Sequence, residues 1–282
     1  MAYLLSNLLQ DAYRALGKTD TFILTGGSTT TIIDTKLEDK YQDDDLKNWT
    51  CFITRDAGGL NAAPENEFNR ISGYVESTNT ATVDTAFTIS PAAGDTVTLT
   101  SDQFPLREMM QQANIALRAL DYLVLTNTSL TSSSTQTEYD LPVALKADDL
   151  VKIEVQTEAT TDDYQWETVP PDAYYILPAS PGSTGEIIFE KYLEDGKTIR
   201  VWYEGLHPDL TAYNSVISET IHPTVAWASL VAHALQWYNT MLSGQDEYYL
   251  QRENKAWRDL EIALAKHPIY KPKKMNRLLT IE

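Results

Sequence analysis

The sequence predicts an α+β protein in which a helical bundle, assembled from separated segments, carries two antiparallel β insertions and an extended C-terminal arm. Four segments repeat apolar residues with the period of a helix, and two long stretches between them are rich in β-branched residues and turn signals. The predicted boundaries place the bundle in residues 1–19, 104–128 and 218–266, the β insertions in residues 20–103 and 129–217, and the arm in residues 267–282.

The first two helices are predicted from apolar stripes bounded by a stop or a start signal. Residues 3–16 carry a leucine-rich stripe that stops before Gly17, and glycine commonly ends helices. Residues 105–124 begin with Pro105, whose fixed φ suits the first helical position. Each of these helices should therefore bury one face.

The last two helices should form an antiparallel pair. The segment that begins at His222-Pro223 is apolar almost all round, so it must be covered on several sides. Residues 246–266 repeat large apolar side chains every seven residues, which is the spacing of a narrow packing seam. The short loop between the two segments favours a helical hairpin.

The two β regions are predicted from alternating apolar and polar residues. The alternation is clearest in VKIEVQ (151–156) and IRVWYE (199–204), as expected for antiparallel strands with one face in water. Turn residues such as Pro170-Pro171-Asp172 and Glu194-Asp195-Gly196 separate the strands.

The glycine pair Gly26-Gly27 in TGGSTTTIID raises the possibility of a phosphate-binding loop. Such a loop needs converging backbone N–H groups, a Lys and a following helix. The glycines are instead followed by Thr and Ile residues, and the nearest downstream Lys is Lys36. The segment is therefore predicted to be a turn that opens a Thr-rich strand.

The composition excludes several classes of protein. The net charge of −18, from 40 acidic and 22 basic residues, opposes tight general binding to nucleic acid, which depends on Lys and Arg. No apolar run is long enough for a membrane span, and no secretory signal is expected at the N-terminus. The single cysteine, Cys51, excludes an intrachain disulfide and a cysteine-based zinc site, and we expect a small buried hydrophobe there.

No arrangement of residues selects a catalytic site, so we expect no enzyme activity, cofactor or metal. The sequence lacks a G-x-S-x-G elbow. His207 and His222 precede prolines, which favours turn or helix-entry roles. Asp43-Asp44-Asp45 lacks the ligand spacing, central Gly and closing Glu of a calcium loop, and should be a solvated loop. A pair of carboxylates for sugar cleavage stays open, because only their spatial separation would identify it.

A binding face in the second β region is a further open alternative. On an outer face of a sheet, aromatic side chains could bind carbohydrate or a protein partner, although core and cross-strand packing explains most of them equally well. The aromatic residues of this region are Tyr164, Trp166, Tyr174, Tyr175, Trp202 and Tyr203.

The C-terminal segment HPIYKPKKMNRLLTIE (267–282) differs from the rest of the chain. Pro268 and Pro272 prevent continuation of the helix, and a basic cluster is followed by apolar residues. An arm that docks into a neighbouring subunit and a solvated terminus are both open, and the apolar residues favour docking. The residues assigned to docking are Tyr270, Lys271, Lys273, Lys274, Arg277, Leu278, Leu279 and Ile281.

Two stretches resemble virion proteins of tailed bacteriophages. The first is TGGSTTTIIDTKLED with NRISGYVESTNTATVDTAFTISPAAGDTVTL, which combines a turn, a Thr-rich strand with Ile-Asp, an acidic loop, an Arg-Ile strand and a closing Pro-x-x-Gly-Asp turn. The second, GKTIRVWYEGLHPDLTAYNSVISETIHPTVAWASLVAHALQWY, is similar to the end of phage neck proteins, where a strand leads through a proline-rich loop to helices. Together they touch about half of the chain.

Among these virion parts the chain looks most like a head–tail adaptor (connector). The resemblance implies a ring, usually of twelve copies, that lies beneath the portal protein, continues the DNA channel and joins tail or neck proteins on its distal side. DNA would slide past an acidic wall without specific binding. The protein would be made in the host cytoplasm and reside in the virion neck, and residues 267–282 would dock onto the portal. The residues expected to pack ring subunits together are Trp227, Leu230, Trp237, Leu250, Trp257 and Leu264.

Two other classes of function stay open. One is a peripheral virion component, such as a neck fibre anchor or a receptor- or glycan-binding module. Tyrosines clustered in a groove would favour it. The other is an enzyme that acts on polysaccharide, which would require glycan cleavage that is lost when one Asp or Glu is changed.

Overall fold

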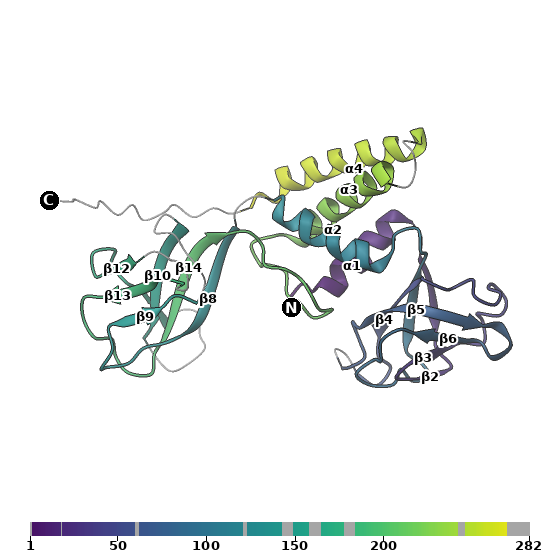
Figure 1. The fold of residues 1–282 in the computed structure, drawn as a ribbon, viewed down its shortest axis with the longest axis horizontal. Coiled ribbons are helices and arrows are strands. Elements are labelled where there is room, and N and C mark those ends of the chain that lie inside the picture. The colour runs from purple at the N-terminus through teal and green to yellow at the C-terminus, as the bar shows by residue number, and fades with distance from the viewer. Residues whose placement is uncertain are drawn as a thin grey trace. The chain divides into compact units, whose positions relative to one another are not determined.

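The computed structural model describes residues 2–17, 19–59, 62–120, 123–142, 149–157, 165–177, 184–241 and 246–269. The chain divides into two compact units. Unit 1 comprises residues 1–121 and 207–269, and unit 2 comprises residues 122–206 and 270–282. Figure 1 shows that the helices and the strands of the first β region belong to unit 1, whereas the described part of unit 2 is built from strands.

The predicted fold class, a helical bundle that carries two β insertions, is wrong. The described residues form 14 strands in three antiparallel sheets and four helices, so the protein is mostly β-sheet. The error has a physical cause. Apolar residues at helical spacing give a strong pattern over many turns, whereas nine of these strands are only three to five residues long and give a weak one. The predicted C-terminal arm from Tyr270 onward lies outside the described residues.

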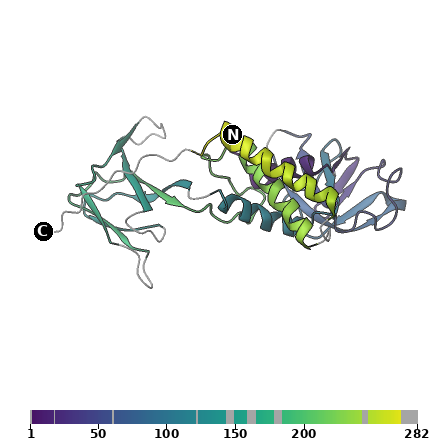
Figure 2. The same cartoon turned by 90° about the horizontal axis from the view of Figure 1, so that it is seen from above.

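The helices of unit 1 pack around α3. The four helices are α1 (Leu5–Leu16), α2 (Leu106–Arg118), α3 (Pro223–Met241) and α4 (Glu247–Lys266). α3 contacts each of the other three, and α4 lies beside it in both views (Figures 1 and 2). Most residues of α3 are buried, so its coverage on several sides is confirmed.

The second helix is shorter than predicted. The sequence favoured a helix over residues 105–124, but α2 ends at Arg118 and a strand, β8 (Leu123–Thr131), follows. β-branched residues stand at alternate positions of VLTNT in this strand and favour extended backbone. β8 pairs antiparallel with β14 (Thr198–Gly205), a partner so distant in the chain that no local pattern reveals it.

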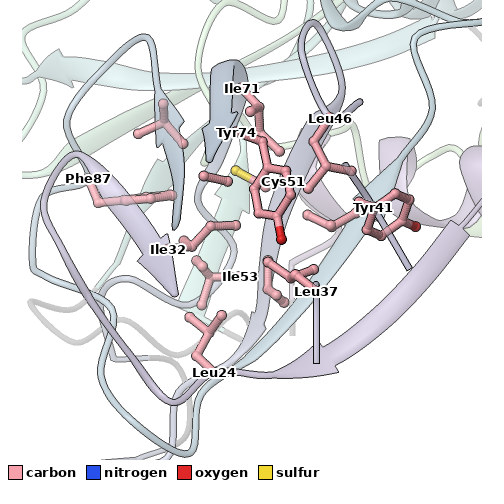
Figure 3. Packing of buried hydrophobic residues seen from close by; sticks show 14 residues of the cluster. Leu24, Ile32, Leu37, Tyr41, Leu46, Cys51, Ile53, Ile71, Tyr74 and Phe87 are labelled. Carbon is pink, nitrogen blue, oxygen red and sulfur yellow. The ribbon is translucent and has the colours of Figure 1, made fainter. Parts of the chain in front are cut away.

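The first β region forms one seven-stranded sheet in the order β1-β7-β4-β5-β6-β3-β2. Its buried side chains form a core with residues of the loop before β4, and Figure 3 shows Leu37, Tyr41 and Leu46 of that loop in one cluster with Cys51 of β4. The strands are β1 (Thr19–Ile23), β2 (Gly26–Ser28), β3 (Thr31–Ile33), β4 (Thr50–Arg55), β5 (Phe68–Val75), β6 (Thr80–Val83) and β7 (Thr96–Thr100).

The Pro-x-x-Gly-Asp turn before β7 is held by a buried carboxylate. Asp95 is fully buried, and its two oxygens accept hydrogen bonds from the backbone N–H groups of Ala57 at 2.9 Å and Ala92 at 2.8 Å. Charge-assisted bonds of this kind are stronger than neutral ones. The Asp therefore ties the turn to the chain that follows β4.

The TGGSTTT segment is a β-hairpin whose turn lies further along the chain than predicted. Gly26 and Gly27 already belong to β2, and Thr29-Thr30 connect β2 to β3. A Cβ atom on Gly27 would lie 2.7 Å from the backbone oxygen of Thr31 and 3.0 Å from that of Pro91. Gly27 is therefore required because two backbones approach it closely.

Gly27→Ala is expected to lower the free energy of unfolding of unit 1 by about 1–3 kcal/mol, because the added Cβ must push a backbone segment away. Gly26→Ala is the matched control, since nothing lies within 4 Å of its Cβ position, and it should stay within about 0.5 kcal/mol of wild type. Denaturant unfolding of the two variants would measure the difference. Equal effects at both positions would contradict the close-approach explanation.

Unit 2 contains two sheets that share one hydrophobic core. One has the order β11-β10-β14-β8 and the other the order β12-β13-β9. The predicted alternation holds for the core side of the sheet, where Ile153 and Val201 are buried, but the other face is not simply in water, because Glu154 of β10 is buried there as well. The remaining strands are β9 (Glu138–Asp140), β10 (Leu150–Gln156), β11 (Trp166–Thr168), β12 (Tyr174–Leu177) and β13 (Glu186–Phe189).

Candidate functional site

α4 packs on α3 through a seam of small and branched side chains. Ala256, Leu260 and Ala263 are the buried residues of α4, and they recur at the spacing of one helix face. The predicted seven-residue repeat, Leu250, Trp257 and Leu264, lies beside this seam. The seam residues are therefore used for packing within one subunit, whereas the residues of the repeat stay partly accessible to solvent.

A groove of about 530 Å³ lies where the end of α1 meets α3 and α4. Apolar side chains of α3 and charged side chains of α4 line it. The residues from α3 are Trp227, Ala228, Val231 and Leu235, those from α4 are Tyr248, Arg252, Lys255, Ala256 and Asp259, and the end of α1 supplies Ala15, Leu16 and Gly17.

Arg252 fixes one wall of this groove. Its Nη2 donates a hydrogen bond of 2.9 Å to the carbonyl oxygen of Leu16, one of the acceptors that a helix C-terminus leaves without an intrahelical partner. The guanidinium carbon also lies 5.7 Å from the ring centroid of Tyr248 and 6.0 Å from that of Tyr249, within the range of cation–π attraction. α4 is thereby tied to the end of α1.

Leu250, Trp257 and Leu264 form a stripe on the flank of α4 opposite to the groove. At 3.6 residues per turn, these positions lie about a quarter of a turn to one side of the buried seam, and the groove positions lie about a quarter of a turn to the other. Leu250 is 36% exposed, and the other two side chains are partly buried. The ring of Trp257 stands edge-on to the buried His233, with 5.0 Å between centroids.

The other predicted packing residues have three different environments. Leu230 is fully buried and belongs to the subunit's own core. Trp227 lines the groove, and Trp237 is partly buried on α3. A role of these residues between subunits stays a prediction.

A pair of stacked histidines lies at the start of the predicted docking arm, whose first residue is His267. His222 at the start of α3 and His267 after the end of α4 have parallel rings with centroids 3.7 Å apart. The backbone N–H of Thr224 donates to Nδ1 of His222 at 3.2 Å. The stack thus joins the first residues of the α3–α4 hairpin to its last. The arm residues Tyr270, Lys271, Lys273, Lys274, Arg277, Leu278, Leu279 and Ile281 lie outside the described residues.

His207 has the turn role that its sequence context favoured. It is 2% exposed, its Nδ1 is 2.7 Å from the carbonyl oxygen of Pro208, and its Nε2 accepts a 3.0 Å hydrogen bond from the backbone N–H of Ser218. One donor and one acceptor on the ring describe a neutral imidazole. Burial lowers the pKa of His207 below its ordinary value.

The stability of unit 1 should therefore fall as the pH drops below about 6.5, the ordinary pKa of histidine. In that window the unfolded chain binds a proton at His207 that the folded chain binds only at lower pH, so stability rises with pH. Thermal unfolding of wild type and His207→Gln at a series of pH values would measure this effect. The variant should show a smaller dependence on pH, and an unchanged dependence would contradict the assignment.

The acidic loop and the cysteine give no sign of chemistry. In the part of the chain that the structure describes, no group of three or more His, Cys, Asp or Glu residues could hold a metal ion. Asp43 and Asp45 are exposed and accept hydrogen bonds from nearby backbone N–H groups. Cys51 is fully buried in β4, and burial raises its pKa to about 12, so the prediction of a small buried hydrophobe is confirmed.

The aromatic residues of unit 2 are distributed over different surfaces. Tyr174 is buried in the core, whereas its neighbour Tyr175 is 49% exposed on the other face of β12. Tyr203 is partly buried and packs against the core. Tyr164 lies outside the described residues. Of the five that the structure describes, Trp166 and Trp202 come together through a shared arginine.

Trp166 and Trp202 belong to a cluster of charged side chains that the sequence analysis missed. The guanidinium carbon of Arg200 lies 3.7 Å from the ring centroid of Trp166, and Nζ of Lys152 lies 4.6 Å from that of Trp202. The indole N–H of Trp202 donates to Glu154 Oε2 at 2.7 Å. The sequence indicates this cluster in KIE (152–154) and RVW (200–202), because charged and aromatic residues at alternate positions of two paired strands share one face.

No helix within the described ranges is long and apolar enough to cross a membrane. No known family model matches the chain, and no curated protein is similar enough in sequence to count as a relative.

Proposed function

We propose that this chain is a structural, non-enzymatic head–tail adaptor of a tailed bacteriophage. In this role it forms a ring, of twelve copies, beneath the portal protein, extends the DNA channel and joins the capsid to tail or neck proteins. The observation that supports it best is the α3–α4 hairpin, which has partly exposed apolar surface on both flanks of α4 and leads directly into the basic and apolar segment 270–282. Exposed apolar surface of this kind is typical of assembly surfaces.

The charge of the chain suits a wall along which DNA moves. A net charge of −18 repels the phosphate backbone and gives DNA no general binding site. The proposed location is the neck of the virion, and the subunit is made in the host cytoplasm before assembly.

A peripheral glycan-binding component receives less support. Carbohydrate binding by stacking needs free aromatic faces, and the two tryptophans of unit 2 that come together already face the cations of Arg200 and Lys152. The buried Glu154 holds the same cluster by ion pairs.

Removal of residues 270–282 is expected to leave a folded subunit that no longer binds its portal. This truncation keeps His267, and with it the stack on His222, so a loss of binding would reflect the arm and not a frayed α4. Co-sedimentation of wild type and truncated chain with the portal protein of the same virus is the measurement. If the truncated chain sediments with the portal as well as wild type does, the arm has no docking role.

A further inference from the structure

We infer that the groove of one subunit takes the stripe of a second copy of this chain, so that subunits join head to tail. The stripe is Leu250, Trp257 and Leu264, and the groove is the cavity between α1, α3 and α4. This inference rests on the proposed ring and names the contact from which the ring is built.

The placement of the two surfaces determines the kind of contact. They lie on opposite flanks of a single helix, each about a quarter of a turn from the buried seam of Ala256, Leu260 and Ala263. Two subunits related by a twofold axis cannot exchange stripe and groove both ways, because each subunit would have to face its partner with both flanks at once. A contact between unlike surfaces repeats from subunit to subunit and closes into a ring when the rotation allows it.

The charges around the two surfaces are complementary. The groove has Arg252, Lys255 and one carboxylate, that of Asp259. The stripe is bordered on the helix by Glu253 and Glu261, two carboxylates. Opposite charges around an apolar contact favour the correct pairing and discourage others.

The same charges distinguish a second copy from the chain's own C-terminal segment. Residues 270–282 carry four cations, Lys271, Lys273, Lys274 and Arg277. The groove has a cationic excess of its own from Arg252 and Lys255. Like charges oppose docking of this segment in the groove, which leaves it for another surface such as the portal.

The test uses one substitution on each surface of the full-length chain. Leu250→Lys places a cation in the stripe, where it would meet the cations of the groove, at a position that is already 36% exposed. Ala15→Trp fills the groove from an exposed position of α1. Ile262→Lys is the matched control, because Ile262 is a 52% exposed apolar residue of α4 that is neither a lining residue of the groove nor part of the stripe.

Sedimentation velocity over a range of concentrations should show assembly of wild type and of Ile262→Lys. Each surface variant should raise the concentration needed for half-assembly by about tenfold or more, which corresponds to the loss of a single favourable contact. Circular dichroism checks that both variants fold, and Lys255→Glu, at an exposed groove position, replaces Ala15→Trp if the latter does not.

An equimolar mixture of the two surface variants gives the sharpest result. One intact groove then meets one intact stripe, so the mixture should form a one-to-one dimer and nothing larger. Assembly of both variants as in wild type would overturn the inference, and so would a wild-type chain that stays monomeric at all concentrations with the portal present. If wild type assembles and the two variants form only the one-to-one dimer, but the wild-type oligomers do not bind the portal, the contact is supported and the adaptor function is contradicted. The chain's own tail would be the occupant of the groove if Lys255 is protected from chemical labelling in a monomer and loses this protection when residues 270–282 are removed. That result would overturn the inference.

Discussion

Tyr13→Ala is expected to lower the free energy of unfolding of unit 1 by about 3–5 kcal/mol, the cost typical of truncating a large buried aromatic side chain. Tyr13 points from α1 into the protein and is 1% exposed. Its ring stands edge-on to Phe52 of β4, with 5.7 Å between centroids, and its hydroxyl donates to the carbonyl oxygen of Phe104 at 2.7 Å. The side chain therefore joins a helix to the seven-stranded sheet and to the segment before α2.

Two further variants separate the contributions of Tyr13. Tyr13→Phe keeps the ring and leaves the carbonyl of Phe104 without its donor, which should cost about 1–2 kcal/mol. Arg14→Ala, on the exposed side of the same helix, should stay within about 0.5 kcal/mol of wild type. Denaturant unfolding with amide exchange of α1 and β4 peptides would measure all three. A cost below about 1 kcal/mol for Tyr13→Ala would mean that α1 and the sheet are not held together by this contact.

Glu154→Ala should destabilise unit 2 by about 2–4 kcal/mol, because it removes the acceptor that three neighbours share. Glu154 is 7% exposed, accepts from the indole N–H of Trp202 at 2.7 Å and forms ion pairs with Lys152 and Arg200. Truncation removes the carboxylate with which both cations pair on this face of the sheet. The partial exposure of Lys152 lets its ammonium turn to water, which keeps the cost below that of a fully buried pair.

The exchange rates of amides in β10 and β14 would report the change for unit 2 alone. Glu154→Gln retains one acceptor oxygen for Trp202 and should have a smaller effect than Glu154→Ala. Glu167→Ala, on the exposed side of the adjacent β11, is the control and should leave these rates unchanged. If Glu154→Ala and Glu167→Ala behave alike, the cluster contributes nothing to the stability of the sheet.

Local patterns were enough to place three of the helices. α1, α3 and α4 begin and end within about two residues of the predicted positions as far as the described residues show, because apolar stripes and stop signals are encoded in neighbouring residues. The end of α2 could not be found in this way. Residues 119–124 continue an apolar pattern that fits a helix, but from Leu123 onward the pairing of β8 with β14 makes the chain extended.

The fold class was wrong because the contribution of the sheets to the core is nonlocal. Strands of only three residues, such as Gly26–Ser28 and Thr31–Ile33, have little pattern of their own. Their burial depends on partners that lie far away in sequence, as β1 does on β7. The strong helical pattern therefore predicted a helical fold, although more residues of the chain form weakly patterned strands.

The assembly surface was predictable only in part. The repeat of Leu250, Trp257 and Leu264 is visible in the sequence, but so is the neighbouring set Ala256, Leu260 and Ala263, and no pattern says which of the two faces α3. The structure assigns the seam to the smaller set. The groove could not be inferred at all, because its wall needs the end of α1 beside Arg252, more than 200 residues away.

Electron microscopy of the full-length chain mixed with the portal protein of the same virus tests the adaptor function most directly. Rings that cap the portal with twelvefold symmetry are expected for wild type, and they should be lost with Leu250→Lys but kept with Ile262→Lys. A chain that remains monomeric and leaves the portal uncapped would contradict the proposed function.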